Sequence, residues 1–330
     1  MTSRHHDAAI RSRALVRDFG DHHAVAGVDL EVGRGEVYGF LGPNGAGKST
    51  TVRMLCTLLA PTSGDAAVAG FDVVSQPGDV RLRIGVALQD AALDPRQTGR
   101  ELLRLQGRLY GLSGRDADRR TQQVGELIDV ADALDRPIAG YSGGMKRRLD
   151  LAAALIHNPE VLFLDEPTTG LDPVSRTTVW QEVERLNHEL GMTIFLTTQY
   201  LEEADVLADR VGIIDDGRIV AEGTPAELKR RVGNDLVIVT LGRGAPDVRG
   251  TLAALPEVVD VDAHGNEVVI SSENGSAAVS DIVVALRDAG AEVKELTLRT
   301  PTLDDVFLEL TGSRMSADEE RPREREEVPA

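Results

Sequence analysis

The chain has 330 residues and a hydrophobic share of 42%, which allow two globular domains of ordinary size with a substantial core. Its net charge of −18 repels a phosphate backbone and argues against nucleic-acid binding. The only cysteine, Cys56, excludes an internal disulfide framework and a cysteine metal cluster. Residues 1–13 lack the apolar segment of a secretory signal, and no apolar run approaches the roughly 18–20 residues of a membrane-spanning helix. We therefore expect a soluble intracellular protein.

Short apolar strands alternate with helical patterns in the first part of the chain, which predicts an α/β domain. Residues 35–45 are typical of a strand that runs into a glycine turn, and we expect a helix from Lys48 onwards. Four apolar residues are expected to share one face of that helix: Val52, Leu55, Leu58 and Leu59. Residues 159–167 and 191–198 are almost wholly apolar, as expected for central parallel strands that are covered on both faces.

The rest of the chain divides into further regions. Between about residues 94 and 150 the pattern is helical without strands, which predicts a helical insertion within a first domain of residues 1–232. Residues 233–312 follow the order βαββαβ and then one short helix. We expect a small split-βαβ, ferredoxin-like α+β domain here, with a hairpin turn at Gly265–Asn266. Residues 313–330 are densely charged with little apolar material, so we expect a disordered tail.

A phosphate-binding loop is predicted between the first strand and its helix. Residues 42–49 fit the pattern G-x-x-x-x-G-K-[ST]. Glycines let consecutive backbone N–H groups curl around phosphate oxygens, and the helix aims its positive end at the same place. We expect Lys48 to bridge the β- and γ-phosphates and the Ser49 hydroxyl to bind Mg²⁺. The residues expected to contact the nucleotide here are Gly42, Pro43, Asn44, Gly45, Ala46, Gly47, Lys48, Ser49 and Thr50.

Two adjacent carboxylates follow a later apolar strand. Asp165, at its carboxyl end, is placed to hold Mg²⁺ directly or through water. Adjacent strand residues point in different directions, so we expect Glu166 to have a separate role, which is to orient and deprotonate the attacking water. An Asp-Glu pair after an apolar run is often only a solvated strand end. A phosphate loop in the same chain favours the metal-and-base interpretation.

The order of these motifs resembles the ATP-binding subunit of an ATP-binding cassette (ABC) transporter. The phosphate loop is followed by LQD at 88–90, YSGGM at 141–145, LFLDEP at 162–167 and TGLD at 169–172. A phosphate loop alone occurs in many NTPases, whereas a Ser-Gly-Gly turn just before the Asp-Glu strand is specific to this family. The resemblance spans residues 10–230 and implies a P-loop NTPase fold, with ATP as the nucleotide and Mg²⁺ as the metal.

In that family, each nucleotide is held between the phosphate loop of one protomer and the Ser-Gly-Gly turn of the other. We call this turn, residues 142–144, the signature turn. The resemblance therefore implies a homodimer that ATP joins and hydrolysis releases. The signature turn is implied to face the γ-phosphate bound by the partner, through a hydroxyl, backbone N–H groups and a helix dipole. The residues implied at this shared site are Tyr141, Ser142, Gly143, Gly144, Met145 and Asp172.

Other positions carry over one by one from the resemblance. Phe19 matches the aromatic residue that stacks on adenine, with Val25 packing nearby. Gln89 matches the glutamine that reaches Mg²⁺ and the attacking water. Gln199 stands where the family usually has a γ-phosphate-sensing histidine. It can donate a hydrogen bond but cannot carry a positive charge or relay a proton, so we expect ATP binding to survive and turnover to be modest. Met145 replaces the usual glutamine of the signature.

The resemblance also extends to a partner and a cargo. A chain without a membrane span must act on a separate permease, whose short helices the family grips with the helical insertion. Residues 196–229 and 301–312 closely resemble the daunorubicin/doxorubicin-resistance branch of bacterial exporters. This implies the ATPase of an exporter for a hydrophobic antibiotic, at the cytoplasmic face of the cell membrane. The drug itself would be contacted mainly by the permease.

Other interpretations stay open. Related subunits export polysaccharides or lipids, and this is the nearest alternative. A soluble cassette ATPase that acts on DNA or ribosomes is disfavoured, because such proteins usually carry two cassettes and this chain has one phosphate loop and an acidic balance. The domain of residues 233–312 is expected to serve dimerisation or docking, and the alternative is a regulator that binds a small ligand.

Overall fold

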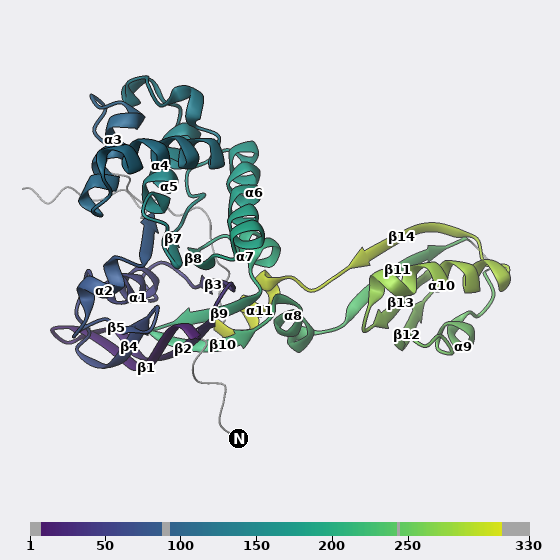
Figure 1. Ribbon diagram of the computed structural model, residues 1–330. Helices are drawn as coiled ribbons and strands as arrows, with labels where there is room; N and C mark the ends of the chain where they lie inside the picture. Colours follow the sequence, from purple (N-terminus) through teal and green to yellow (C-terminus); the bar gives the residue numbers. More distant parts are fainter. Residues whose placement is uncertain (1–7, 88–92, 243–244, 312–330) are drawn as a thin grey trace, which may run out of the picture. The chain divides into compact units, whose positions relative to one another are not determined.

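The computed structural model describes residues 8–87, 93–242 and 245–311 (Figure 1). The described chain forms two compact units, divided between Pro225 and Ala226. The domain boundary predicted at residue 232 lies within the second unit. No helix in the described ranges is long and apolar enough to cross a membrane. The expected tail of residues 313–330 lies outside the described residues.

A six-stranded sheet organises unit 1, in the order β10-β9-β3-β8-β7-β6 (Figure 1). Its strands are β3 (Val37–Leu41), β6 (Ile84–Ala87), β7 (Val161–Asp165), β8 (Thr193–Thr198), β9 (Arg210–Asp215) and β10 (Arg218–Gly223). Neighbouring strands are parallel, apart from β10, which pairs antiparallel with β9. Every residue of β3, β7 and β8 is buried, which confirms the central parallel strands predicted from the apolar runs.

The helix after the phosphate loop, α1 (Lys48–Leu55), is shorter than the sequence predicts. Thr57 takes a positive φ of 62°, which turns the chain out of helical geometry. Leu58 is then 58% exposed. The prediction that Leu58 and Leu59 continue the apolar face of this helix is therefore wrong, because the helix has ended before them.

A second sheet of unit 1 is antiparallel, in the order β2-β1-β4-β5, and the sequence analysis did not predict it. Its strands are β1 (Ala8–Phe19), β2 (His22–Gly33), β4 (Ser63–Val68) and β5 (Phe71–Asp72). Apolar residues of β1 and β2 join α1 and the central sheet in one hydrophobic cluster, as Leu15, Val28, Met54 and Phe40 illustrate. This packing brings the hairpin between β1 and β2 to the loop between β3 and α1.

Helices make up the region between β6 and β7, as predicted. They are α3 (Gly99–Leu109), α4 (Gly114–Leu127), the short 3₁₀ helices of Ala131–Ala133 and Ile138–Gly140, and α5 (Gly143–Leu155). Thr98, Ser113 and Ser142 cap the three longer helices, because each side chain accepts a hydrogen bond from a backbone N–H of the first turn. The remaining helices of unit 1 are α2 (Pro77–Arg81), α6 (Pro173–Leu190) and α7 (Leu201–Leu207).

Unit 2 contains an antiparallel sheet in the order β12-β13-β11-β14. Helix α8 (Pro225–Val232) begins one residue before the start of unit 2. The other elements are β11 (Asp235–Leu241), α9 (Arg249–Leu252), β12 (Val258–His264), β13 (Glu267–Ser272), α10 (Gly275–Asp288), β14 (Val293–Arg299) and α11 (Leu303–Thr311). This is the predicted βαββαβ order followed by one helix, with the hairpin turn at Gly265–Asn266. Helix α9, the first helix in this order, has only 4 residues.

Candidate nucleotide-binding site

A cavity of about 450 Å³ opens over the loop between β3 and α1. The loop supplies one side, the β1–β2 hairpin a second, and the ends of β7 and β8 a third. The residues that line the cavity are Phe19, His22, Ala24, Asn44, Gly45, Gly47, Lys48, Ser49, Thr50, Glu166 and Gln199. Six of the nine residues predicted from the phosphate-loop pattern therefore line the cavity, and the lining as a whole comes from four segments of the chain.

At Gly47, the backbone of the phosphate loop has a conformation that favours glycine. Gly47 has a φ of 105°, and a β-carbon there would lie 2.4 Å from the carbonyl oxygen of Ala24. Its carbonyl accepts the backbone N–H and the hydroxyl of Thr51, both at 2.9 Å. The Ala46 carbonyl accepts the N–H of Gly217, which ties the loop to the β9–β10 turn. These hydrogen bonds tie the loop to the first turn of α1 and to the β9–β10 turn.

Lys48 is buried at the base of this cavity. Its Nζ donates to the carbonyl oxygens of Gly42, at 2.7 Å, and Pro43, at 3.1 Å. Glu166 Oε1 lies 3.9 Å from the same nitrogen. Burial lowers the pKa of Lys48, while the charges of Glu166 and Asp165 act in the opposite direction. The two backbone carbonyls thus hold the ammonium group at the cavity.

Asp165 and Ser49 form an oxygen pair suited to a divalent cation. Ser49 Oγ donates to Asp165 Oδ1 at 3.4 Å, and Thr197 Oγ1 donates to the same oxygen at 2.5 Å. Mg²⁺ is usually held by one or two carboxylates together with substrate phosphates, rather than by an all-protein cage. Accordingly, no cluster of three or more His, Cys, Asp or Glu side chains in the described ranges could hold a metal alone. The donor set fits Mg²⁺ shared with a nucleotide.

Glu166 adopts an unusual backbone conformation for its residue type. Its φ is 48°, which costs a non-glycine residue about 1–3 kcal/mol and often marks a functional position. The backbone N–H donates to the carbonyl oxygen of Thr197 at 3.0 Å and to its Oγ1 at 3.1 Å. Thr169 Oγ1 donates to Glu166 Oε2 at 3.3 Å. Glu166 itself lines the cavity.

The part of the cavity where the sequence analysis expected adenine differs in detail from that prediction. Phe19 lines the cavity with 47% of its surface exposed, and the Arg17 guanidinium lies 4.6 Å from its ring centroid. Val25 is fully buried in the core instead, beside Gly47. His22 and Ala24 of the hairpin line the cavity, and the sequence analysis missed both because nothing local marks them. Gln199 also lines the cavity, and Gln89 lies outside the described residues.

The signature residues do not line this cavity. Ser142 and Gly143 are exposed at the start of α5, where Ser142 Oγ accepts the N–H of Met145 at 3.2 Å. Tyr141 is buried and donates to the carbonyl oxygen of Ala133. A β-carbon on Gly143 would meet no atom within 4 Å. The turn therefore presents the N-terminus of α5 to the surface of unit 1.

Asp172 lies on the same exposed side as the signature turn. It is the N-cap of α6 and accepts the N–H groups of Val174 and Ser175, and the Ser175 hydroxyl. The bonds from Ser175 lower the pKa of this exposed carboxyl. A β-carbon on Gly144 would lie 3.8 Å from Ser175 Oγ, so the two motifs are neighbours. Together they form one surface that is separate from the phosphate loop of the same chain.

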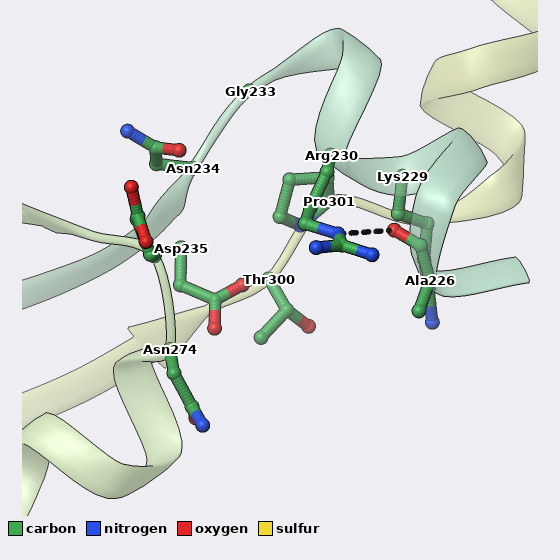
Figure 2. Close-up of a pocket in the computed structure, with 10 residues that line it drawn as sticks. Ala226, Lys229, Arg230, Gly233, Asn234, Asp235, Asn274, Thr300 and Pro301 are labelled. Carbon is green, nitrogen blue, oxygen red and sulfur yellow. Dashed lines mark hydrogen bonds between the residues drawn. The ribbon is translucent and has the colours of Figure 1, made fainter.

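A different cavity of about 330 Å³ lies within unit 2, between α8, the start of β11 and the start of α10 (Figure 2). Its lining carries two cations, Lys229 and Arg230, and two carboxylates, Asp235 and Glu273. Asp235 Oδ2 accepts the N–H of Gly275 at the start of α10, at 2.8 Å. Charges of both signs are thus present, and the N-terminus of α10 is already occupied by a carboxylate of the chain itself.

The parallel sheet, the phosphate loop and the two carboxylates define a P-loop NTPase of the ABC type. Residues 25–169 match the family model described as ABC transporter, and residues 223–311 match the model of the ATP-binding protein DrrA1-3-like, C-terminal domain. The chain belongs to the family of ABC transporter ATP-binding proteins that carry this DrrA-like C-terminal domain. It is thus an ATP-binding and ATP-hydrolysing subunit.

Three relatives illustrate the similarity. The daunorubicin resistance ATP-binding protein DrrA3 of Streptomyces coeruleorubidus is 50% identical, over 93% of this chain and 96% of that protein. The daunorubicin/doxorubicin resistance ATP-binding protein DrrA of Streptomyces peucetius is 44% identical, over 92% of both. The Nod factor export ATP-binding protein I of Cupriavidus metallidurans is 38% identical, over 93% of this chain and 99% of that protein.

Solved structures agree on the fold of unit 1. A structure titled as the ATP binding subunit of an ABC transporter superposes with a TM-score of 0.61 at 28% identity, over 68% of this chain and 92% of that one. The cbiO1 protein of Clostridium perfringens, part of the ABC transporter complex cbiONQ, gives a TM-score of 0.63 at 28% identity, over 67% and 90%.

Proposed function

We propose that this chain energises export of a hydrophobic drug through a separate membrane permease, at the cytoplasmic face of the membrane, and so confers resistance. The observation that carries the proposal is the extent of similarity to drug-resistance ATP-binding proteins. It reaches 44–50% identity and includes the C-terminal domain as well as the ATPase. The permease would contact most of the drug, so the cargo itself is inferred from these relatives.

Export of a polysaccharide or lipid is the alternative. A relative named for Nod factor export is covered at least as fully as the drug-resistance relatives, although at 38% identity. A cassette ATPase without a permease is less compatible with the similarity to named exporters.

ATP binding would use groups that the structure already holds in place. Backbone N–H groups from Gly45 to Ser49 would surround the phosphates, and Lys48 would reach the β- and γ-phosphate oxygens. Phe19 would stack on the base. Mg²⁺, held by Ser49 and Asp165, would neutralise charge on the phosphates. Gln89 is proposed to reach the same metal.

Hydrolysis would depend on Glu166 and Gln199, which face the cavity from the ends of β7 and β8. Glu166 would orient a water molecule and accept its proton as the water attacks the γ-phosphate. Gln199 would donate a hydrogen bond to the γ-phosphate. Because its amide cannot carry charge, it would stabilise the developing negative charge less than a protonated histidine does.

Each site would be completed by a second copy of the chain. The phosphate cavity of one chain is open, and its own signature turn lies on a separate surface together with Asp172. Two copies that face each other head to tail would bring Ser142, Gly143 and Gly144 of one to the γ-phosphate bound by the other, with two sites under twofold symmetry. Tyr141 and Met145 would support that turn. ATP would thereby join the dimer.

We further propose that the permease docks between the central sheet and the helical insertion. A cavity of about 330 Å³ lies there, lined by residues of β6, α3 and α5. Leu58 lines it and is 58% exposed, so a short helix with an apolar face could cover it. Leu58→Glu should weaken assembly with the permease and leave nucleotide binding intact. Leu190→Glu, at an exposed leucine at the end of α6, is the matched control.

The C-terminal domain, residues 233–312, is proposed to support docking or dimerisation. Truncation near Gly233 should then reduce assembly with the permease. An unchanged assembly together with an altered response of the ATPase to drug would favour a ligand-binding regulator instead.

The central experiment combines the chain with the permease encoded by a neighbouring reading frame that has about six apolar spans. Cells that express both should resist a hydrophobic antibiotic and accumulate less of it, and Glu166→Gln should abolish both effects. Resistance that persists in Glu166→Gln cells would contradict the proposal. Secretion of a polysaccharide or lipid without any drug efflux would favour the alternative.

A further inference from the structure

Helices α6 and α7 are held together at two points that lie one turn apart. Trp180 Nε1, on α6, donates to Glu203 Oε1, on α7, at 3.0 Å. The guanidinium of Arg176 lies over the ring of Tyr200, with 4.2 Å from Cζ to the ring centroid. Arg176 and Trp180 are in an i, i+4 relationship, so both side chains leave the same face of α6. We call these two contacts the α6–α7 clasp.

The carboxyl group of the clasp is completely buried. Glu203 is 0% exposed, and burying an acidic group costs several kcal/mol unless it is well partnered. Burial raises the pKa of Glu203, while the hydroxyls of Thr198 and Thr168 act in the opposite direction. The Thr168 hydroxyl is near enough to the carboxylate to lower its pKa, but within the described ranges neither Thr168 Oγ1 nor Glu203 Oε2 has a partner in good hydrogen-bond geometry. A leucine would fill this space at less cost, so the acid needs a reason other than packing.

The clasp connects two segments that have separate positions in the site. Helix α7 directly follows Gln199, and the Tyr200 N–H donates to Thr198 Oγ1 at 2.9 Å, which closes the turn that carries Gln199. Helix α6 begins after Asp172, and Arg176 Nε donates to the carbonyl oxygen of Leu171 at 3.2 Å. One side of the clasp therefore holds Gln199, which lines the nucleotide cavity. The other side holds the loop on the surface of the signature turn.

We propose that the α6–α7 clasp positions Gln199 for ATP hydrolysis by fixing its turn against the helix that begins at Asp172, with Glu203 as the central positioning residue. The inference rests on the proposed function, because it assigns a task in the same ATPase site. None of the four clasp side chains lines the nucleotide cavity. Loss of the clasp should therefore misplace Gln199 and Asp172 at the moment of hydrolysis, and leave the contacts of the phosphate loop with ATP unchanged.

The test uses the full-length chain and measures kcat and KM for ATP, and the Kd of a fluorescent ATP analogue. Glu203→Ala should lower kcat at least about tenfold, because small displacements of catalytic groups cost that much or more, and change KM and Kd less than about twofold. Glu203→Gln should recover most of the loss, because an amide oxygen can accept the Trp180 N–H. Glu202→Ala, the same substitution at the exposed neighbour on α7, should leave kcat unchanged.

Further variants test the contact between Arg176 and Tyr200 and the hydrogen bond that Trp180 donates. Tyr200→Phe keeps the ring under Arg176 and should retain more activity than Tyr200→Ala. Trp180→Phe keeps most of the volume but removes the N–H donor, and should lower kcat towards the Glu203→Ala value. Trp180 is the only tryptophan of the chain, so its emission reports on the clasp directly. The spectrum should shift in Glu203→Ala and return in Glu203→Gln.

Two results would overturn the inference. One is a wild-type kcat in both Glu203→Ala and Trp180→Phe. The other is a loss in which kcat, KM and melting temperature change together and Glu203→Gln recovers nothing, since that pattern indicates a role in packing alone. Failure of the proposed function would give a different result: the Glu166→Gln variant would hydrolyse ATP as fast as the wild-type chain.

Discussion

Lys48 and Glu166 face each other across the base of the nucleotide cavity, with 3.9 Å between Nζ and Oε1 and side chains only 4% and 9% exposed. Opposite charges at this separation attract more strongly than on the surface, because little water screens them. The pair places the cation that would hold the γ-phosphate beside the base that would activate water. The fold therefore places both groups at one point of the cavity.

We expect this pair to contribute to the stability of the nucleotide-free protein. Lys48→Met, Glu166→Gln and the double variant form a double-mutant cycle, measured by urea unfolding without nucleotide. A coupling free energy of about 1 kcal/mol is expected for charges in contact. Free energies of unfolding that add within about 0.3 kcal/mol would show that the two groups do not interact.

Two glycines of the phosphate loop should respond differently to alanine. Gly47→Ala places a β-carbon 2.4 Å from the Ala24 carbonyl oxygen at a φ of 105°, whereas Gly45 has a φ of 86° with nothing within 4 Å. Gly45→Ala should cost about 1 kcal/mol from backbone strain alone, and Gly47→Ala at least twice that, because a clash is added. Thermal unfolding without nucleotide measures both. Equal losses would contradict the tight approach of the hairpin to the loop.

Gln199 should limit turnover. Gln199→His restores a side chain that can be protonated, so we expect kcat to rise and its pH profile to gain a group that titrates near about 6.5. Gln199→Leu, which cannot donate a hydrogen bond, should lower kcat and leave the Kd for ATP almost unchanged. Steady-state kinetics between pH about 5.5 and about 8.5 provide the measurement. An unchanged rate and pH profile in both variants would exclude a role for this position.

Glu182 should make stability depend on pH. It lies on α6, is 5% exposed and accepts a hydrogen bond from Arg148 Nε at 2.9 Å. Burial raises the pKa of Glu182 from 4.5 to about 7, although Arg148 opposes the shift. The folded protein therefore binds more protons than the unfolded chain between these values, and the free energy of unfolding falls as pH rises through this window.

Glu182→Gln should remove that part of the pH dependence. Urea midpoints at pH about 5, 6 and 7.5 measure it, and Glu184→Gln, on the exposed side of the same helix, is the control. The slope should flatten for Glu182→Gln and persist for the control. A persistent slope in Glu182→Gln would mean that the ion pair keeps this carboxylate charged throughout.

The parts of the fold that the sequence predicted are those with a strong local pattern. β7 and β8 are fully buried, so their apolar runs are continuous, and the helical insertion has no competing strand signal. The antiparallel sheet was missed because β1 has only one covered face and irregular alternation. Ala14 has a φ of 44°, and the pairing of β1 with β2 shifts register at four places.

The residues of the candidate site also differ in whether the sequence alone could predict them. The phosphate loop and the pair of Asp165 and Glu166 are contiguous, so their spacing alone indicates chemistry. His22 reaches the cavity only because the hairpin packs on the loop, and Trp180 meets Glu203 only through the packing of α6 on α7. Tertiary contacts of this kind leave no spacing signature in a single sequence.

The central claim, that each ATP is shared by two copies, is tested most directly by mixing two inactive chains. Lys48→Ala removes the phosphate-loop cation, and Ser142→Arg blocks the signature turn, so each homodimer should be inactive. Their mixed dimer retains one site with a wild-type loop and a wild-type turn. We predict that mixing equal amounts restores about a quarter of the wild-type ATPase rate, because half of the dimers are mixed and each has one of two sites. In the control, wild type is mixed with an equal amount of a chain that carries both substitutions. Their mixed dimer has no intact site, so the ATPase rate should fall from the half expected for chains that work singly to about a quarter, which comes from wild-type homodimers. No recovery on mixing two folded, nucleotide-binding variants would contradict the shared site.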